Sequence, residues 1–218
     1  GWLTAAASLA SIKGQGPDLV YLPEKSFCMK DFLEQVEAIY NEKGKCLIAV
    51  SEGIRNRRGR LISDTGKVDS FGHPQLGGLA AILSEKINKK LNVKVRGIEL
   101  SLLQRCAAHC ASKTDIEESF AAGKAAVENA VAGTTDKMVG YKRTYVDGKY
   151  KCSIKLFDLT DVANTEKKVP LSWINKDNTG MSEKFIKYAL PLIEGETDLP
   201  KEDGLPRFVN LKKVLVKK

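Results

Sequence analysis

A near-continuous apolar run at residues 45–50 (KCLIAV) constrains the fold more than any other feature of the sequence. Strands covered on both faces of a parallel sheet have such runs, whereas strands with one solvated face alternate apolar and polar residues. A second apolar run at 18–23 precedes it, and residues 30–41 between the two place apolar side chains at helical spacing. This strand, helix, strand order predicts an α/β fold with a parallel-sheet core and flanking helices.

The alternation continues and then changes after Gly133. Further helices are predicted over 2–12, 75–91 and 115–131, and a further strand over 93–100. Beyond Gly133, two alternating runs at 138–144 and 151–157 are joined through Asp147-Gly148, a turn sequence that favours a hairpin. The sequence therefore predicts a small antiparallel pair in addition to the parallel core.

The 218 residues, 43% of them hydrophobic, are enough for a substantial core. We divide them into an α/β region at 1–133 and a region at 134–218. The second region holds the antiparallel pair, a helix predicted over 183–190 and a tail, and it is expected to complete the same fold. No run of about 18 apolar residues occurs, so no membrane-spanning helix is expected.

The net charge of +8 is compatible with nucleic acid, anionic lipid or a small phosphorylated ligand as partner. The densest basic cluster follows the apolar run, at Arg55, Arg57, Arg58 and Arg60. It is either a phosphate site or an exposed basic loop. Because the cluster lacks interleaved aromatic residues, nucleic acid is not expected as partner. A membrane is not expected either, because the sequence has no apolar run long enough to span one.

The five cysteines are scattered and odd in number, which favours a reducing, cytoplasmic setting over a disulfide framework. Cys106, His109 and Cys110 lie close together, but no second pair completes the four ligands of a structural zinc site. His73 and His109 are the two imidazoles available as general bases, and neither has a nucleophile motif beside it. Packing roles are therefore favoured for both.

Ligands bind beyond the carboxyl ends of the strands in open parallel sheets, and Glu52, Arg96 and Arg105 fall near such positions. An arginine within an apolar strand is costly unless an anion pairs with it. Arg96 either pairs with Glu99 or Glu52 and ties the sheet together, or it converges with Arg105 on a phosphate. In the second case the Glu52 carboxylate would accept hydrogen bonds from sugar hydroxyls.

Several stretches together resemble 6-phosphofructokinases in order and rough spacing, over nearly the whole chain. They are DLVYLPE at 18–24, IAVSEG at 48–53, FGHPQLGG at 71–78, VRGIELSLLQRCAAHCASK at 95–113 and VANTEKKV at 162–169. In detail they look most like the branch that contains pyrophosphate-dependent enzymes, the diphosphate–fructose-6-phosphate 1-phosphotransferases. The resemblance implies that this chain is the C-terminal portion of such an enzyme.

The resemblance also implies site residues. Glu52 would contact the sugar of fructose 6-phosphate, Arg105 would reach the same substrate, and Arg96 would be lent across a subunit interface of a homodimer or homotetramer. Leu102 stands where many relatives have His or Tyr, so it could contribute only its backbone and its bulk. Cys106-Ala107 likewise replaces glycines that relatives carry after the arginine.

The family's glycine-rich donor loop, its catalytic aspartates and a Met-Gly-Arg stretch are not found in this chain, and the resemblance places them before Gly1. We therefore expect no catalytic residue and no metal ligand here, with Mg²⁺ bound mainly by the missing half. The chain alone is expected to be inactive. With that half, the resemblance implies phosphoryl transfer from pyrophosphate or ATP to fructose 6-phosphate, giving fructose 1,6-bisphosphate in glycolysis. The alternative is a non-catalytic sugar-phosphate-binding or regulatory module.

Overall fold

The computed structural model describes residues 1–68, 74–76 and 78–215. The α-helices are α1 (Trp2–Ala6), α2 (Met29–Lys43), α3 (Leu79–Leu91), α4 (Lys113–Val131), α5 (Leu159–Val162) and α6 (Glu183–Ala189). The strands are β1 (Leu19–Tyr21), β2 (Ile48–Val50), β3 (Asp64–Val68), β4 (Pro74–Leu76), β5 (Lys137–Val146), β6 (Lys149–Asp158), β7 (Lys201–Glu202) and β8 (Leu205–Pro206). Short 3-10 helices lie at Ala7–Lys13, Ser101–Arg105, Ala108–Cys110, Leu171–Trp173 and Leu190–Ile193. None of the helices in the described ranges is long and apolar enough to cross a bilayer.

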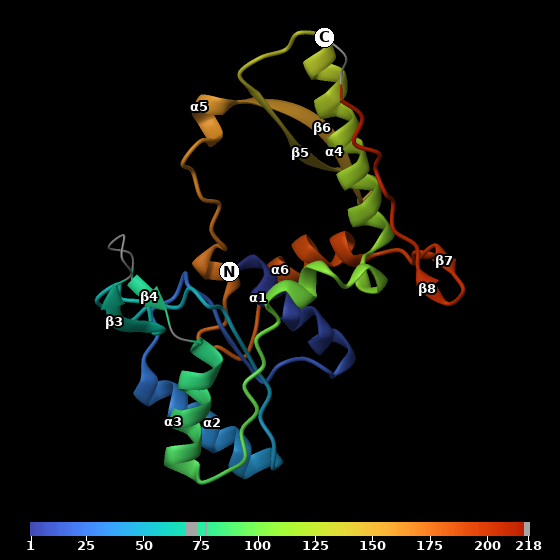
Figure 1. Cartoon of the computed structure of the whole chain (residues 1–218). Coiled ribbons are helices and arrows are strands. Elements are labelled where there is room, and N and C mark those ends of the chain that lie inside the picture. The colour runs from blue at the N-terminus through green and yellow to red at the C-terminus, as the bar shows by residue number, and fades with distance from the viewer. Residues whose placement is uncertain (69–73, 77, 216–218) are drawn as a thin grey trace. The chain divides into compact units, whose positions relative to one another are not determined.

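The chain forms two compact units (Figure 1). The first contains Gly1–Ser101 and Ala163–Leu190, and the second contains Leu102–Val162 and Pro191–Lys218. The units interleave along the chain, whereas the sequence suggested consecutive regions that meet at residue 133. The division into regions at 1–133 and 134–218 stays a prediction.

The first unit is built around the parallel pair of β1 and β2, which confirms the predicted α/β core. Leu19 pairs with Ile48, and Tyr21 pairs with Val50. Helix α2 makes the connection between the two strands and ends at Gly44, whose φ of 69° is the left-handed conformation that glycine adopts readily. Helix α3 packs beside α2 (Figure 1), and the two are joined at the surface by an ion pair between Lys90 Nζ and Glu37 Oε2 at 2.8 Å.

The two faces of β1 belong to two different hydrophobic clusters. Leu19 and Tyr21 pack into the cluster beneath α2 and α3, whereas Val20 and Leu22 pack into the cluster formed with α1 and α6. Successive side chains of a strand point to opposite faces, so this three-residue strand contributes to both cores. The sequence placed a strand covered on both faces at 45–50, and there the three residues of β2 are partly buried, with Ile48 and Val50 against one cluster and Ala49 against the other.

The segment at 163–190 completes the first unit by returning to β1. The backbone N–H of Val20 donates to the carbonyl of Asn178 at 2.7 Å. Lys25 Nζ donates to the carbonyl of Lys176 at 2.6 Å and to Asn178 Oδ1 at 2.7 Å. Phe185, which is 1% exposed, fills the centre of the second cluster. A part of the chain more than a hundred residues away is thus built into the first unit.

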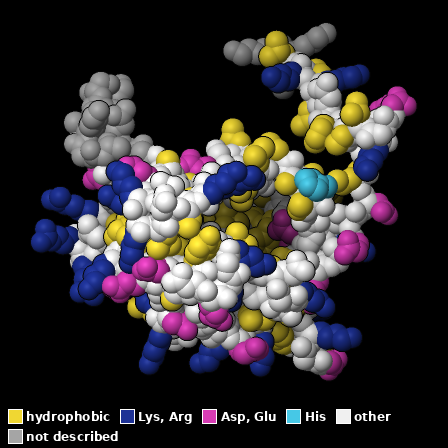
Figure 2. Space-filling view, turned by 90° about the horizontal axis from the view of Figure 1, so that it is seen from below, with side chains coloured by type: hydrophobic (Ala, Val, Ile, Leu, Met, Phe, Trp, Pro, Cys, Tyr) yellow, Lys and Arg dark blue, Asp and Glu magenta, His cyan; other side chains and the backbone are white. Residues whose placement is uncertain are grey.

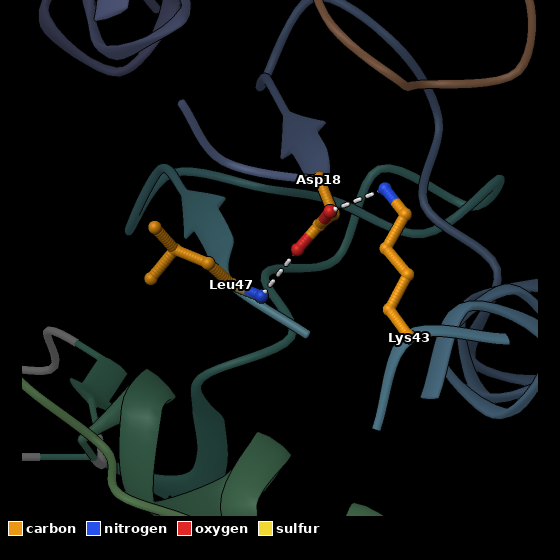
Figure 3. A network of polar contacts seen from close by, with 3 residues as sticks. All are labelled: Asp18, Lys43 and Leu47. Atoms are coloured by element: carbon orange, nitrogen blue, oxygen red, sulfur yellow. Dashed lines mark hydrogen bonds and ion pairs between the residues drawn. The ribbon is translucent and has the colours of Figure 1, made fainter. Parts of the chain in front are cut away.

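The amino ends of β1 and β2 are held by Asp18 (Figure 3). One carboxylate oxygen accepts a hydrogen bond from the backbone N–H of Leu47 at 2.8 Å, and the other pairs with Lys43 Nζ at 2.8 Å. Burial by itself would raise the pKa of this carboxyl, but the Leu47 N–H and the Lys43 ammonium together hold its pKa below the ordinary value. The network joins the end of α2 to the start of both strands and so helps to fix their register.

The prediction of a strand over 93–100 is wrong. These residues have no strand partner in the described part of the chain, although Val93 and Val95 pack partly buried against the cluster beneath α2 and α3. The alternation of partly buried and exposed side chains is therefore present without a hydrogen-bonded ladder. The helix predicted over 75–91 starts later than expected, at Leu79, because Pro74–Leu76 forms β4.

The second unit places α4 along the predicted hairpin of β5 and β6. The hairpin turn is confirmed at Asp147 and Gly148, whose φ angles of 50° and 75° are those of a two-residue type I′ turn. The N-cap of α4 is Ser112, so the helix begins two residues earlier than the predicted range of 115–131. Ser112 Oγ accepts from the N–H of Asp115 at 3.1 Å and donates to the carbonyl of Leu192 at 2.7 Å.

Candidate functional site

The carboxyl ends of β1 and β2 bring two acidic loops together. The loop after β1 ends in Pro23-Glu24, and the loop after β2 is Ser51-Glu52-Gly53. The N–H of Ser51 donates to the carbonyl of Tyr21 at 3.0 Å, and a Cβ placed on Gly53 would lie 3.5 Å from Pro23 Cβ. Glu52 is exposed at this edge, as its position after an apolar strand predicts.

Glu24 is a candidate that the sequence reasoning did not single out. Its Oε1 accepts a hydrogen bond from the N–H of Val169 at 3.0 Å, whereas Oε2 is buried and has no hydrogen-bond partner among the described residues. A buried carboxylate oxygen without a donor is costly, so it is ready to accept one. The sequence did carry the signal, because Glu24 follows β1 as Glu52 follows β2.

The arginine cluster after Glu52 is a tight, internally bonded turn. Asn56 Oδ1 accepts from the N–H groups of Arg58 at 2.9 Å and Arg60 at 3.1 Å, and Arg55 Nη1 donates to the carbonyl of Gly59 at 2.9 Å. The guanidinium groups of Arg57, Arg58 and Arg60 are exposed and have no ion-pair partner in the described ranges. The hydrogen bonds thus hold the backbone of the turn in place, and the turn presents exposed positive charges close to Glu52 in the sequence.

Arg96 is exposed and lies on an extended segment beside the start of α3. A Cβ on the adjacent Gly97 would lie 2.8 Å from Ser84 Oγ and 3.0 Å from the Ala80 carbonyl oxygen, so only glycine allows this approach. No ion pair joins Arg96 to Glu99 or Glu52 in the part of the chain that the structure describes, so the interpretation of Arg96 as a tie within the sheet is not supported. Its guanidinium is available to an anion.

Leu102 and Arg105 lie on the 3-10 helix Ser101–Arg105, and both are exposed. They belong to the second unit, whereas Glu52 and Arg96 belong to the first. The positions of Glu52 and Arg96 are therefore described within the first unit, and those of Leu102 and Arg105 within the second. Leu102 exposes 65% of its surface, much as its neighbour Leu103 exposes 69%.

The cysteine and histidine candidates show no metal geometry. Cys106, His109 and Cys110 are exposed, and no group of three or more His, Cys, Asp or Glu side chains that could hold a metal ion occurs among the described residues. His73 lies outside the described residues. Burial raises the pKa of the Cys46 thiol to about 11, so that thiol stays protonated near neutral pH.

Charge on the surface is mixed in sign. Figure 2 shows one face of the molecule. Lys and Arg side chains gather along its left margin, and over the rest of the face Lys, Arg, Asp and Glu side chains are mixed. The excess of positive charge does not form one continuous basic surface on that face. Localised anion sites fit this distribution better than an extended nucleic-acid track.

A family model for phosphofructokinase matches residues 1–130. The chain is 43% identical, over its full length, to the pyrophosphate–fructose 6-phosphate 1-phosphotransferase of Xanthomonas campestris, of which it covers 53%. Solved structures of pyrophosphate-dependent phosphofructokinases from Marinobacter aquaeolei and Nitrosospira multiformis match all of it, with TM-scores of 0.81 and 0.82 and identities of 35% and 36%. The chain covers 51% of each of these two, so it spans about half the length of its relatives.

Proposed function

Because the chain belongs to the phosphofructokinase family, we propose that it supplies the sugar-phosphate-binding half of a 6-phosphofructokinase. The complete enzyme transfers a phosphoryl group to the 1-hydroxyl of fructose 6-phosphate and forms fructose 1,6-bisphosphate. The observation that carries the proposal is the meeting of two acidic loops at the carboxyl edge of β1 and β2, where α/β proteins bind ligands.

The roles of the site residues follow from their chemistry. The guanidinium groups of Arg105 and Arg96 match phosphate oxygens and stay charged at any working pH. The Glu52 carboxylate accepts hydrogen bonds from sugar hydroxyls, and Leu102 contributes its backbone and apolar bulk at the wall of the site. These residues bind and orient the acceptor sugar.

We propose pyrophosphate as the donor, because the relatives that match the whole chain are named for it. ATP is the alternative donor. Mg²⁺ would neutralise charge on the donor and would be held mainly by residues outside this chain. The transfer step depends on a positioned donor and metal, so this chain alone is expected to bind without turnover.

Arg96 supports a proposed homodimer or homotetramer in the cytoplasm, since an exposed arginine without an ion pair among the described residues can reach a site on another subunit. The competing function is a sugar-phosphate-binding or regulatory module without catalysis. Turnover of pyrophosphate by the complete protein separates the two. A complete protein that binds fructose 6-phosphate but turns over neither donor would favour the module.

The binding role is tested by Arg105→Ala, with Arg207→Ala as a control that removes the same charge from an exposed position in the same unit. Isothermal titration with fructose 6-phosphate should show affinity about 100-fold weaker for Arg105→Ala, because a charge-assisted bidentate contact is lost. Arg207→Ala should bind as the unchanged protein does. Equal weakening in both variants would mean that Arg105 contributes only general positive charge.

A further inference from the structure

The segment at 93–100 runs back along helix α3, and both of its ends are held there. Figure 1 shows the chain turning back after α3 and passing beside the helix. Near the end of α3, Asn88 Nδ2 donates to the carbonyl of Val93 at 3.0 Å. At the start of α3, a Cβ built on the N-cap residue Gly78 would lie 2.7 Å from Glu99 Oε1. The Glu99 carboxylate therefore lies at the N-terminus of the helix, where negative charge is favoured.

The contact that leaves least room lies between these two ends, at Gly97. A Cβ built on it would lie 2.8 Å from Ser84 Oγ and 3.0 Å from the Ala80 carbonyl oxygen. Non-bonded heavy atoms attract best at about 3.5–4.0 Å, so both distances are too short. The Ser84 hydroxyl can rotate away, but the Ala80 oxygen belongs to the helix backbone. A side chain at position 97 would therefore move the segment away from α3.

The contacts with the first unit alternate along the segment. Val93 and Val95 pack against the cluster beneath α2 and α3, and Gly97 meets α3 itself. Lys94 and Arg96, which alternate with them, are exposed. Successive side chains of an extended chain point to opposite sides, and a slip of one residue exchanges the two sides. The contacts with α3 therefore determine that the Arg96 side chain points away from the helix.

We propose that helix α3 positions Arg96 for the phosphate of fructose 6-phosphate, and that Gly97 is the positioning residue that allows the segment to approach the helix closely enough. The inference rests on the proposed role of Arg96 in the sugar-phosphate site. Groups that bind a substrate must be held to within about 0.5 Å of the productive geometry. Because Arg96 is the residue next to Gly97, a shift of the segment at Gly97 displaces the guanidinium group as well.

The first experiment measures binding of fructose 6-phosphate to the complete protein by isothermal titration. Arg96→Ala should weaken binding on the order of 100-fold, because the charged contact is removed. Gly97→Ala should weaken it on the order of 10-fold, because the guanidinium group is displaced but still present. The double variant should bind no more weakly than Arg96→Ala alone, since no guanidinium group remains to be displaced. A residue that stabilised only the fold would add its loss in both backgrounds.

Asn88→Ala is a second variant, and it loosens the other end of the segment by removing the hydrogen bond to the Val93 carbonyl. Asn88 is exposed, so its replacement should leave the protein folded. Binding should weaken on the order of threefold, and this loss should also disappear in the Arg96→Ala background. In turnover with pyrophosphate, Asn88→Ala and Gly97→Ala should raise the KM for fructose 6-phosphate and leave kcat unchanged. A contact to the sugar phosphate is the same in the ground state and in the transition state.

Gly140→Ala is the matched control for Gly97→Ala. Gly140 lies in the second unit, and a Cβ built on it would lie 2.8 Å from a ring carbon of Phe157. The same change thus causes similar crowding away from the Arg96 segment. It should lower the Tm and leave the affinity for fructose 6-phosphate unchanged. Circular dichroism checks that all variants stay folded.

The inference is overturned if Gly97→Ala binds fructose 6-phosphate as tightly as the unchanged protein. It is also overturned if the loss persists in the Arg96→Ala background, or if Gly140→Ala reproduces it. None of these results affects the proposed site, which Arg96→Ala tests by itself. If Arg96→Ala binds normally, the role proposed for Arg96 fails, and the inference that rests on it fails with it.

Discussion

Asp18 shows how one side chain can fix the start of a sheet. Its carboxylate joins the last turn of α2 to the first residues before β2, through Lys43 and the N–H of Leu47. Both Lys43 and the N–H of Leu47 favour the charged form of the Asp18 carboxyl group. Because its pKa is lower in the folded protein than in an unfolded chain, Asp18 stabilises the fold above the ordinary carboxyl pKa of about 3.9, and the stabilisation is lost as the pH falls through the folded value.

Asp18→Asn should therefore lower the free energy of unfolding by about 1–2 kcal/mol at pH 7, since a charge-assisted hydrogen bond and an ion pair are weakened together. The difference from the unchanged protein should shrink at pH 3. Urea unfolding at the two pH values measures it. Asp198→Asn is the control, because Asp198 is exposed. A loss that does not depend on pH would contradict the role of the charge.

The site residues illustrate what the sequence could supply at this scale. Glu52 is recognisable because it follows an apolar strand, and Glu24 could have been recognised in the same way. The hydrogen bond that Glu24 Oε1 accepts from the N–H of Val169 could not be recognised, since the two residues are 145 apart in the sequence. Arg96 was expected to be costly inside a strand, but its side chain is exposed, so that argument does not apply.

At the scale of elements, helix ends were predictable where one residue determines them. Gly44 ends α2, and Asp147-Gly148 turns the hairpin, because few residues adopt a positive φ. The choice between Ser112 and Thr114 as the cap of α4 was not predictable, because both are good caps and both hydroxyls donate to a carbonyl, Ser112 to that of Leu192 and Thr114 to that of Glu194. The segment at 93–100 has a strand pattern, but a pattern alone provides no ladder partner.

Ser112→Ala should lower the free energy of unfolding of the second unit by about 1–2 kcal/mol, because it removes a cap and leaves the Leu192 carbonyl without its donor. Ser119→Ala serves as the control, since Ser119 is exposed on the same helix. Thermal unfolding followed by circular dichroism measures both. If the two variants unfold alike, the cap does not contribute.

At the scale of the whole molecule, the two units differ in how far apart their parts lie in sequence. The first unit closes only when 163–190 returns to β1, and it contains both tryptophans, Trp2 and Trp173. Periodicity predicts each element but not which distant element it meets, so the interleaving could not be read from the pattern. The resemblance to phosphofructokinases indicated the family, but the two regions drawn at the sequence level, 1–133 and 134–218, were consecutive.

A chain that ends after Val162 should lose cooperative unfolding of the first unit, because Val169, Met181 and Phe185 leave its core. A chain that ends after Leu190 keeps that core and should retain the transition. Tryptophan fluorescence reports on the first unit in both chains, from Trp2 alone in the shorter chain and from Trp2 and Trp173, which pack against the same cluster, in the longer one. A cooperative Trp2 transition in the shorter chain would show that 163–190 is dispensable.

The division of β1 between two cores has a consequence for how relatives of this protein can diverge. An inserted or deleted residue within 19–22 would exchange the side chains of Leu19 and Tyr21 with those of Val20 and Leu22, and so repack both clusters at once. Insertions in the basic turn at 55–60 would disturb neither cluster. Length variation among descendants of this sequence should therefore gather in that turn and be excluded from the short strand.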